Sequence, residues 1–277
     1  MIFHSGVDSE RLKREANAME QIFHNRIVFL FSSWLEQPPV GSQFEADHAL
    51  FSKLQWNGNV AHFFNYEPDS SFLCIQMELC KFALASWLKE NTTAESRNLP
   101  RIKGSFKQIV EGVEYLHDKN LIHRDLKSDN ILFVAEDNLK ICDLGIAVDR
   151  IIDQGTEIMT IRNGTGEQAC PHGKELTVTR TCRGTKDYMS PEQLSIFSQL
   201  NAKSDVFTLG LILTELCVVM DCDRKVEVFN NFRSGKPNDI FSDLDTARFA
   251  VALTHIYASE RPSCKEMLTH PFFDSFV

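Results

Sequence analysis

Apolar and polar positions along the first part of the chain predict one helix followed by strands. Residues 6–25 place apolar side chains three to four positions apart, which indicates an amphipathic helix, with Asp8 or Ser9 as its N-cap. The apolar runs 26–36 and 71–80 predict strands. Between them, about 36–70, turn signals at Pro38-Pro39 and Asn57-Gly58-Asn59 indicate an insertion.

The rest of the chain is predicted to be mainly helical. Residues 101–120 carry a stripe of apolar side chains on one face: Ile102, Phe106, Ile109, Val113 and Leu116. Short strands are expected at 130–134 and 138–143, and a helix that is apolar all round at 203–220. The pattern predicts an α+β protein with a small lobe over 1–80 and a larger helical lobe over 81–277.

Composition narrows the classes of protein that fit this pattern. The net charge of −9 argues against a surface that binds nucleic acid directly. The eight cysteines are scattered, several of them in apolar runs, so we expect reduced thiols in a cytoplasmic protein. Cys170, His172 and Cys182 lack an evident fourth ligand for zinc. No signal peptide and no apolar run of membrane-spanning length is seen, so no membrane association is expected.

The stretch IHRDLKSDN, residues 122–130, gathers groups suited to phosphoryl transfer. Asp125 would accept the proton of the attacking hydroxyl, and Lys127 would offset charge on the moving phosphoryl group. Asn130, with Asp143 at the end of the second short strand, would hold Mg²⁺. The alternative is a charged surface loop in which the motif occurs by chance.

Three further segments favour the catalytic interpretation because they follow in order: GTKDYMSPEQ (184–193), KSDVFTLGLILTEL (203–216) and ERPSCKEMLTHPFF (260–273). Together with HRDxxxxN and DxG, they resemble the eukaryotic protein kinases over nearly the whole chain. The resemblance implies a bilobal fold, with ATP and Mg²⁺ as nucleotide and cofactor. It also implies that the mainly helical large lobe is complete and that the small β-rich lobe is incomplete.

Roles follow from the resemblance at matching positions. Asp125 is similar to the catalytic base, Asn130 and Asp143 to the metal ligands, and Lys127 to the lysine typical of serine/threonine specificity. The resemblance further implies an ion pair between Glu192 and Arg261 and an Asp205 that braces the catalytic loop. Ser190 replaces the usual alanine before Pro-Glu, which is expected to be harmless.

The resemblance also implies a nucleotide site. Met77 resembles the gatekeeper, Glu78 and Cys80 the hinge that meets adenine, and Leu132 the floor beneath the ring. Leu144 replaces the usual phenylalanine after the metal-binding aspartate and keeps an apolar side chain there.

Within the kinases, the segments FLCIQMELC, GTKDYMSPEQ and LGLILTEL and the insertion are similar to those of the kinases of the α subunit of eukaryotic translation initiation factor 2. That resemblance implies this subunit as substrate, with docking near 221–235, control of translation under stress, and a possible homodimer. The alternative for 221–235 is an ordinary amphipathic surface helix.

One half of a kinase site is not evident in the sequence. Glu15 matches the helix glutamate that pairs with a strand lysine, but that lysine would fall just before Met1. Lys13 cannot replace it because it lies two residues from Glu15 on the same helix. No GxGxxG motif occurs. We therefore expect this chain alone to be weak or inactive, as a truncated kinase, a natural weak enzyme, or a pseudokinase that acts as a binding module.

The long segment between Asp143 and Glu192 carries candidate regulatory threonines. A phosphate on Thr179 or Thr181 would pair with Arg124 and order the segment. Thr185 is expected near Asp125 and Lys127 instead. The alternative for Thr179 and Thr181 is that they are plain solvated residues.

Overall fold

A computed structural model describes residues 22–36, 72–93, 95–143, 148–149, 185–195, 201–236 and 239–274. The chain divides into two compact units, residues 1–79 and 80–277. Most of the helix expected at 6–25, nearly all of the insertion and most of the segment between Asp143 and Glu192 lie outside the described residues.

In the first unit, two strands form an antiparallel pair. β1 (Leu30–Glu36) pairs with β2 (Phe72–Met77), with Trp34 opposite Cys74. Just beyond the pair, the Glu78 backbone N–H donates to the Phe29 carbonyl at 2.8 Å. Both strands were expected, but β1 begins four residues later than its apolar run, because Arg26–Phe29 lie outside the ladder.

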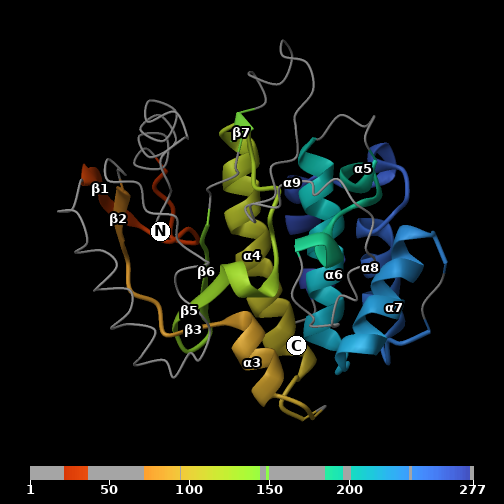
Figure 1. Ribbon diagram of the computed structural model, residues 1–277. Helices are drawn as coiled ribbons and strands as arrows, with labels where there is room; N and C mark the ends of the chain where they lie inside the picture. The colour runs from red at the N-terminus through yellow and green to blue at the C-terminus, as the bar shows by residue number, and fades with distance from the viewer. Residues whose placement is uncertain are drawn as a thin grey trace, which may run out of the picture. The chain divides into compact units, whose positions relative to one another are not determined.

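The second unit combines short strands with a group of helices (Figure 1). β3, β5 and β6 form an antiparallel sheet, and β4 pairs with β7. This mixture confirms the expected α+β class. In chain order the elements are β3 (Phe82–Ala83), α3 (Leu84–Glu90), α4 (Leu99–Asp118), β4 (Leu121–Ile122), η2 (Ser128–Asn130), β5 (Ile131–Ala135), β6 (Asn138–Ile141), β7 (Val148–Asp149), η4 (Thr185–Tyr188), α5 (Pro191–Leu194), α6 (Ala202–Cys217), α7 (Cys222–Arg233), α8 (Leu244–Leu253), η5 (Ala258–Glu260), α9 (Cys264–Leu268) and η6 (Pro271–Phe273).

Helix α4 forms where the apolar stripe predicted it. The Asn98 side chain caps its first turn by accepting from the Arg101 backbone N–H at 2.9 Å, and Pro100 occupies an early position that tolerates proline. All five residues of the stripe are buried. The ring of Phe106 meets those of Phe249, Phe272 and Phe273, so α4, α8 and the chain's last short helix share one aromatic core.

Helix α6 is buried on every side from Ser204 to Leu216, as its continuous apolar sequence predicted. It begins at an Asn201 cap and lies beside α8 (Figure 1). The chain approaches closely at Gly210, where an added Cβ would lie 2.5 Å from Thr254 Cγ2 and 2.9 Å from the Leu253 Cβ. Because α6 crosses the interior, polar side chains on it can reach the catalytic loop from within the core.

A buried guanidinium closes the ends of two helices. Arg97 donates to the carbonyls of Leu88 and Asn91 at the end of α3, at 2.7 and 2.6 Å. It also donates to the carbonyls of Glu215 and Val218 at the end of α6, at 2.7 and 2.9 Å. The last carbonyls of a helix lack partners within it, so one side chain satisfies groups from both.

The described cysteines are thiols, with one exception. Burial raises the pKa of Cys142 and of Cys217 to about 12, so both thiols stay protonated. Cys222 is disulfide-bonded, so the expectation of thiols throughout is wrong at this position. Within the described ranges, the helices are too short or too polar to cross a bilayer.

Candidate active site

The catalytic loop, which follows β4, is hydrogen-bonded to Asp205 on α6. The Asp205 Oδ2 accepts from the His123 backbone N–H at 2.9 Å and lies 2.8 Å from His117 Nε2, and its Oδ1 accepts from the Arg124 N–H at 2.9 Å. Burial raises the pKa of Asp205, but the hydrogen bond and charge of His117 and the hydrogen bond from the Arg124 backbone N–H help to outweigh it and hold the pKa below its ordinary value. The expected bracing by Asp205 is confirmed.

Asp205 holds an unusual backbone conformation next to the predicted base. Arg124 has φ +68°, a left-handed conformation that a non-glycine residue adopts only when its surroundings enforce it. The next backbone N–H, that of Asp125, donates to His123 Nδ1 at 3.3 Å. The other ring nitrogen, His123 Nε2, therefore donates to the Cys142 carbonyl at 3.1 Å.

The structure brings Asp125, Lys127 and Asn130 together. Lys127 Nζ donates to Asp125 Oδ2 at 2.7 Å, and Asn130 Nδ2 donates to the same oxygen at 3.2 Å and to the Asp125 carbonyl at 2.8 Å. Asp125 Oδ1 is buried and, among the described residues, has no hydrogen-bond partner. A buried carboxylate oxygen without a donor can accept a proton or a hydroxyl hydrogen bond.

Asn130 and Asp143 fit a magnesium site. The backbone N–H of Cys142 donates to the Asn130 carbonyl at 2.9 Å, which places Asp143 directly beside the end of η2. Because the amide nitrogen of Asn130 faces Asp125, its oxygen points the other way. One carboxylate and one amide oxygen suit Mg²⁺, which usually keeps few protein ligands and binds phosphate oxygens as well.

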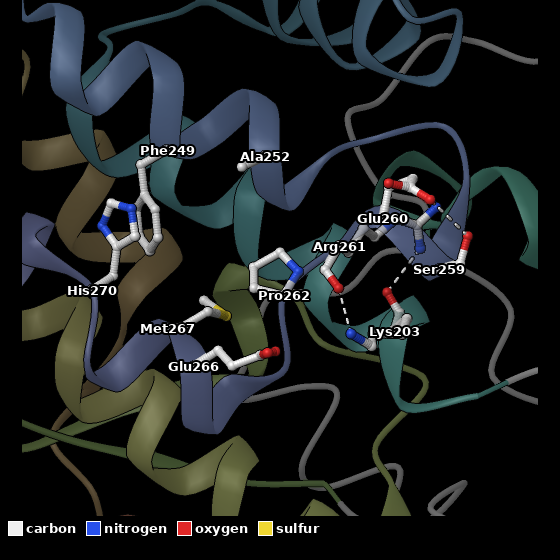
Figure 2. A pocket seen from close by; sticks show the side chains of 10 residues that line it. All are labelled: Lys203, Phe249, Ala252, Ser259, Glu260, Arg261, Pro262, Glu266, Met267 and His270. Carbon is white, nitrogen blue, oxygen red and sulfur yellow. Dashed lines mark hydrogen bonds between the residues drawn. The ribbon is translucent and has the colours of Figure 1, made fainter.

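The Glu192–Arg261 ion pair is confirmed. Arg261 Nη1 and Nη2 donate to the two oxygens of Glu192 at 2.6 and 2.9 Å, and the Arg261 side chain is fully buried. Burial raises the pKa of Glu192, but the hydrogen bonds and charge of Arg261 outweigh it and hold the pKa below its ordinary value. Figure 2 shows Arg261 beside Lys203, whose Nζ donates to the Arg261 carbonyl, at the edge of a cavity of about 430 Å³.

Ser190 has a role that the sequence did not suggest. Its hydroxyl caps α5 by accepting from the Gln193 N–H at 3.4 Å, while Gln193 Oε1 accepts from the Ser190 N–H at 2.9 Å. Gln193 Nε2 then donates to the Arg124 carbonyl at 3.1 Å. The substitution for alanine thus supports a short helix that touches the catalytic loop.

A second polar cluster was also missed. Tyr188, from the GTKDYMSPEQ segment, donates to Glu215 Oε2 of α6 at 2.5 Å. Its oxygen lies 2.8 Å from Ser128 Oγ in the catalytic loop and 2.8 Å from Lys225 Nζ of α7. No sequence spacing signals this set, because its members come from four separate segments.

The residues expected around adenine belong to both units. Glu78 and the half-exposed Met77 belong to the first unit, whereas Cys80 and Leu132 belong to the second. Leu132 lies on β5, opposite Ala83 and Lys140. The adenine roles of these residues stay predictions. Glu15, Leu144, Thr179 and Thr181 lie outside the described residues.

Comparison with known proteins agrees with this geometry. The family model of the protein kinase domain matches residues 4–273 of the chain. The chain is 37% identical over 216 residues to the eukaryotic translation initiation factor 2-alpha kinase pek-1 of Caenorhabditis elegans, covering 75% of this chain and 19% of that protein. It is 32% identical over 264 residues to the interferon-induced, double-stranded RNA-activated protein kinase of Rattus norvegicus, covering 94% and 44% respectively.

A third relative, the eukaryotic translation initiation factor 2-alpha kinase 1 of Rattus norvegicus, is 34% identical over 218 residues, which are 73% of this chain and 33% of that protein. The chain thus spans less than half the length of each of these relatives. With the kinase-domain match over nearly its whole length and a catalytic loop braced from α6, the chain belongs to the protein kinase family, among the serine/threonine kinases.

Proposed function

We propose that the chain transfers the γ-phosphate of ATP to a serine or threonine of the α subunit of translation initiation factor 2, and so controls translation under stress in the cytoplasm. The observation that carries the chemistry is the buried Asp125 Oδ1, which has no partner among the described residues. The names of the relatives support the substrate.

The roles of the loop residues follow from their contacts. Lys127 and Asn130 both hold Asp125 Oδ2, so Oδ1 is the atom left to accept a hydroxyl proton. As the hydroxyl oxygen bonds to the γ-phosphorus, the bond to the β,γ-bridging oxygen breaks, its electron pair leaves with ADP, and the proton passes to Asp125. Mg²⁺, when held by Asn130 and Asp143, would neutralise charge on the phosphates.

The exposed face of α7 is proposed as the docking surface for the substrate. Asp223, Val226, Glu227 and Asn230 all face solvent on this helix, whereas Val228, Phe229 and Phe232 anchor its other face in the core. A rigid helix with an anchored apolar face can present a fixed set of side chains to a protein. Homodimer formation is proposed on the resemblance to the initiation factor kinases alone.

The test is transfer of labelled phosphate from Mg-ATP to the purified α subunit, with an unrelated basic protein as the second acceptor. We expect the α subunit to be preferred and the transfer to be lost in Asp125→Asn. Equal labelling of both acceptors would reject the substrate assignment.

Because the sequence holds no GxGxxG motif, we further propose that transfer by the chain alone is slow. The same assay is therefore run with the chain fused behind the glycine-rich loop and strand lysine of a related kinase. Failure of both forms to transfer phosphate would favour the binding-module alternative.

A further inference from the structure

The polar cluster that joins Tyr188, Glu215, Lys225 and Ser128 has one consistent arrangement of protons. Burial, with the neighbouring charge of Glu215, raises the pKa of Tyr188 well above its ordinary value, so the phenol keeps its proton. That single proton is donated to Glu215 Oε2. The phenol oxygen must then accept from both other neighbours, Lys225 Nζ and the Ser128 hydroxyl, each at 2.8 Å.

Lys225 supplies the positive charge of the cluster. Its Nζ lies 2.6 Å from Glu215 Oε1 and 4.4 Å from the centre of the Tyr188 ring. The side chains of Lys225 and Glu215 are only 17% and 9% exposed, so little water reaches the pair. Without the ammonium group, the Glu215 carboxylate would remain as a buried charge and Tyr188 would lose a donor.

Ser128 connects the cluster to the groups that perform the chemistry. It is the first residue of η2, directly after Lys127, and the same short helix ends at Asn130, which holds Asp125. The catalytic loop is thus fixed at its beginning by Asp205 and at its end by the phenol of Tyr188.

The opposite end of α7 is tied to the same segment of chain. Arg233 Nε donates to the Met189 carbonyl at 2.8 Å, and its Nη2 donates to the Asp187 carbonyl. Both ends of helix α7 therefore bond to the segment around Tyr188. A cavity of about 290 Å³ is lined by Lys225, Ser128 and Asp129, so the cluster borders a recess at the start of α7.

We infer that Lys225 is a positioning residue for phosphoryl transfer, which makes α7 part of the apparatus that orders the catalytic loop as well as a docking surface. The docking role of α7 rests on the proposed function. The positioning role of Lys225 does not, because the cluster lies within the kinase unit whatever the substrate is. A cation on a docking helix that also sets the catalytic loop would let substrate binding raise the turnover rate.

The test compares Lys225→Met with Lys225→Arg, and uses Arg248→Met as the control. Arg248 lies on α8, and within the part of the chain that the structure describes its one ion pair is an exposed contact with Asp245 at 3.7 Å. In Lys225→Met we expect kcat to fall about tenfold with both acceptor proteins, the scale set by loss of one charged hydrogen bond, while KM for ATP stays within about twofold. Lys225→Arg should recover most of the rate.

Amide hydrogen exchange gives a readout that needs no turnover. Exchange should quicken in residues 126–131 and 186–190 of Lys225→Met, and stay unchanged in Lys225→Arg and Arg248→Met. If Lys225→Met fails to fold, Tyr188→Phe, which keeps the ring but removes the shared hydroxyl, should show the same losses.

Unchanged kcat and unchanged exchange in Lys225→Met would overturn the inference. A raised KM for the α subunit alone, with kcat and exchange as in the wild type, would also overturn it, since Lys225 would then be a docking contact only. If the α subunit is not a substrate, the unrelated acceptor still reports kcat, so failure of the proposed substrate is distinguished from failure of this inference.

Discussion

Replacing Asp205 by asparagine tests whether the catalytic loop depends on its anchor in α6. The carboxylate accepts three hydrogen bonds, two at Oδ2 and one at Oδ1, and none of its acceptor sites is open to water. An amide has only one oxygen. Its best placement keeps His117 and His123 on that oxygen and turns the NH₂ group toward the Arg124 backbone N–H, so that two donors face each other.

These contacts set how far Asp205→Asn lowers the free energy of unfolding. One hydrogen bond to a charged group is lost, worth about 1.5–3 kcal/mol, and a buried donor is left unsatisfied, worth about 1–3 kcal/mol. The sum agrees with the roughly 3–5 kcal/mol typical of removing one charge from a buried network. At about 2–4 °C per kcal/mol for a domain of this size, Tm should fall by roughly 6–20 °C.

The rate of transfer should fall further than the loss of folded protein explains. The bond from the Arg124 N–H to Asp205 holds Arg124 at positive φ, and Asp125 is the next residue. Release of that strain would move the base, so kcat measured well below Tm should drop as well. Asp245→Asn, at an exposed carboxylate on α8, is the matched control and should change the free energy of unfolding by no more than about 0.5 kcal/mol. If Asp205→Asn lowers the free energy of unfolding by less than about 1 kcal/mol and keeps the wild-type kcat, the anchoring role is refuted.

Other substitutions test separate parts of the structure. Asp125→Asn should lower the transfer rate by about 10²–10⁴ without a change in far-UV circular dichroism, and wild-type turnover would exclude it as the base. Gly210→Ala should lower the free energy of unfolding by about 1–3 kcal/mol, because the added Cβ would crowd α8. Gly104→Ala, with open space around its Cβ, should raise the free energy of unfolding by about 0.5–1 kcal/mol. Equal Tm shifts in the two variants would contradict the close helix contact at Gly210. The lowered pKa of Glu192 means that its pair with Arg261 stabilises the fold above the unfolded pKa of about 4.3 and loses this effect as pH falls through the folded-state pKa. Tm of the wild type should therefore fall more steeply below about pH 4 than that of Glu192→Gln, and parallel curves would argue against the pair.

Long helices could be predicted from the sequence, but their ends could not. The apolar stripe of α4 repeats over several turns, and the apolar run of α6 is too long for a strand. The run at α6 continues to Met220, yet the helix ends at Cys217, where Arg97 takes the last carbonyls. A capping side chain more than a hundred residues away leaves no local signal.

The candidate site also has a part that the sequence predicts and a part that it does not. Asp125, Lys127 and Asn130 could be found because they lie within six residues and their spacing itself carries the chemistry. The cluster around Tyr188 could not, since Ser128 and Tyr188 are separated by 60 residues and meet only in the folded chain. Tyrosine, glutamate and lysine are also common surface residues, so none of them draws attention alone.

The guanidinium of Arg97 has a consequence for how sequence variation in this chain should be interpreted. Among the described residues it has no carboxylate partner at salt-bridge distance, yet it gathers carbonyls from the ends of α3 and α6. A lysine there would keep the charge but lack the planar fork of donors that reaches both helices. A conservative-looking variant at Arg97 would thus lose activity as a folding defect, and only a stability measurement would distinguish it from a damaged active site.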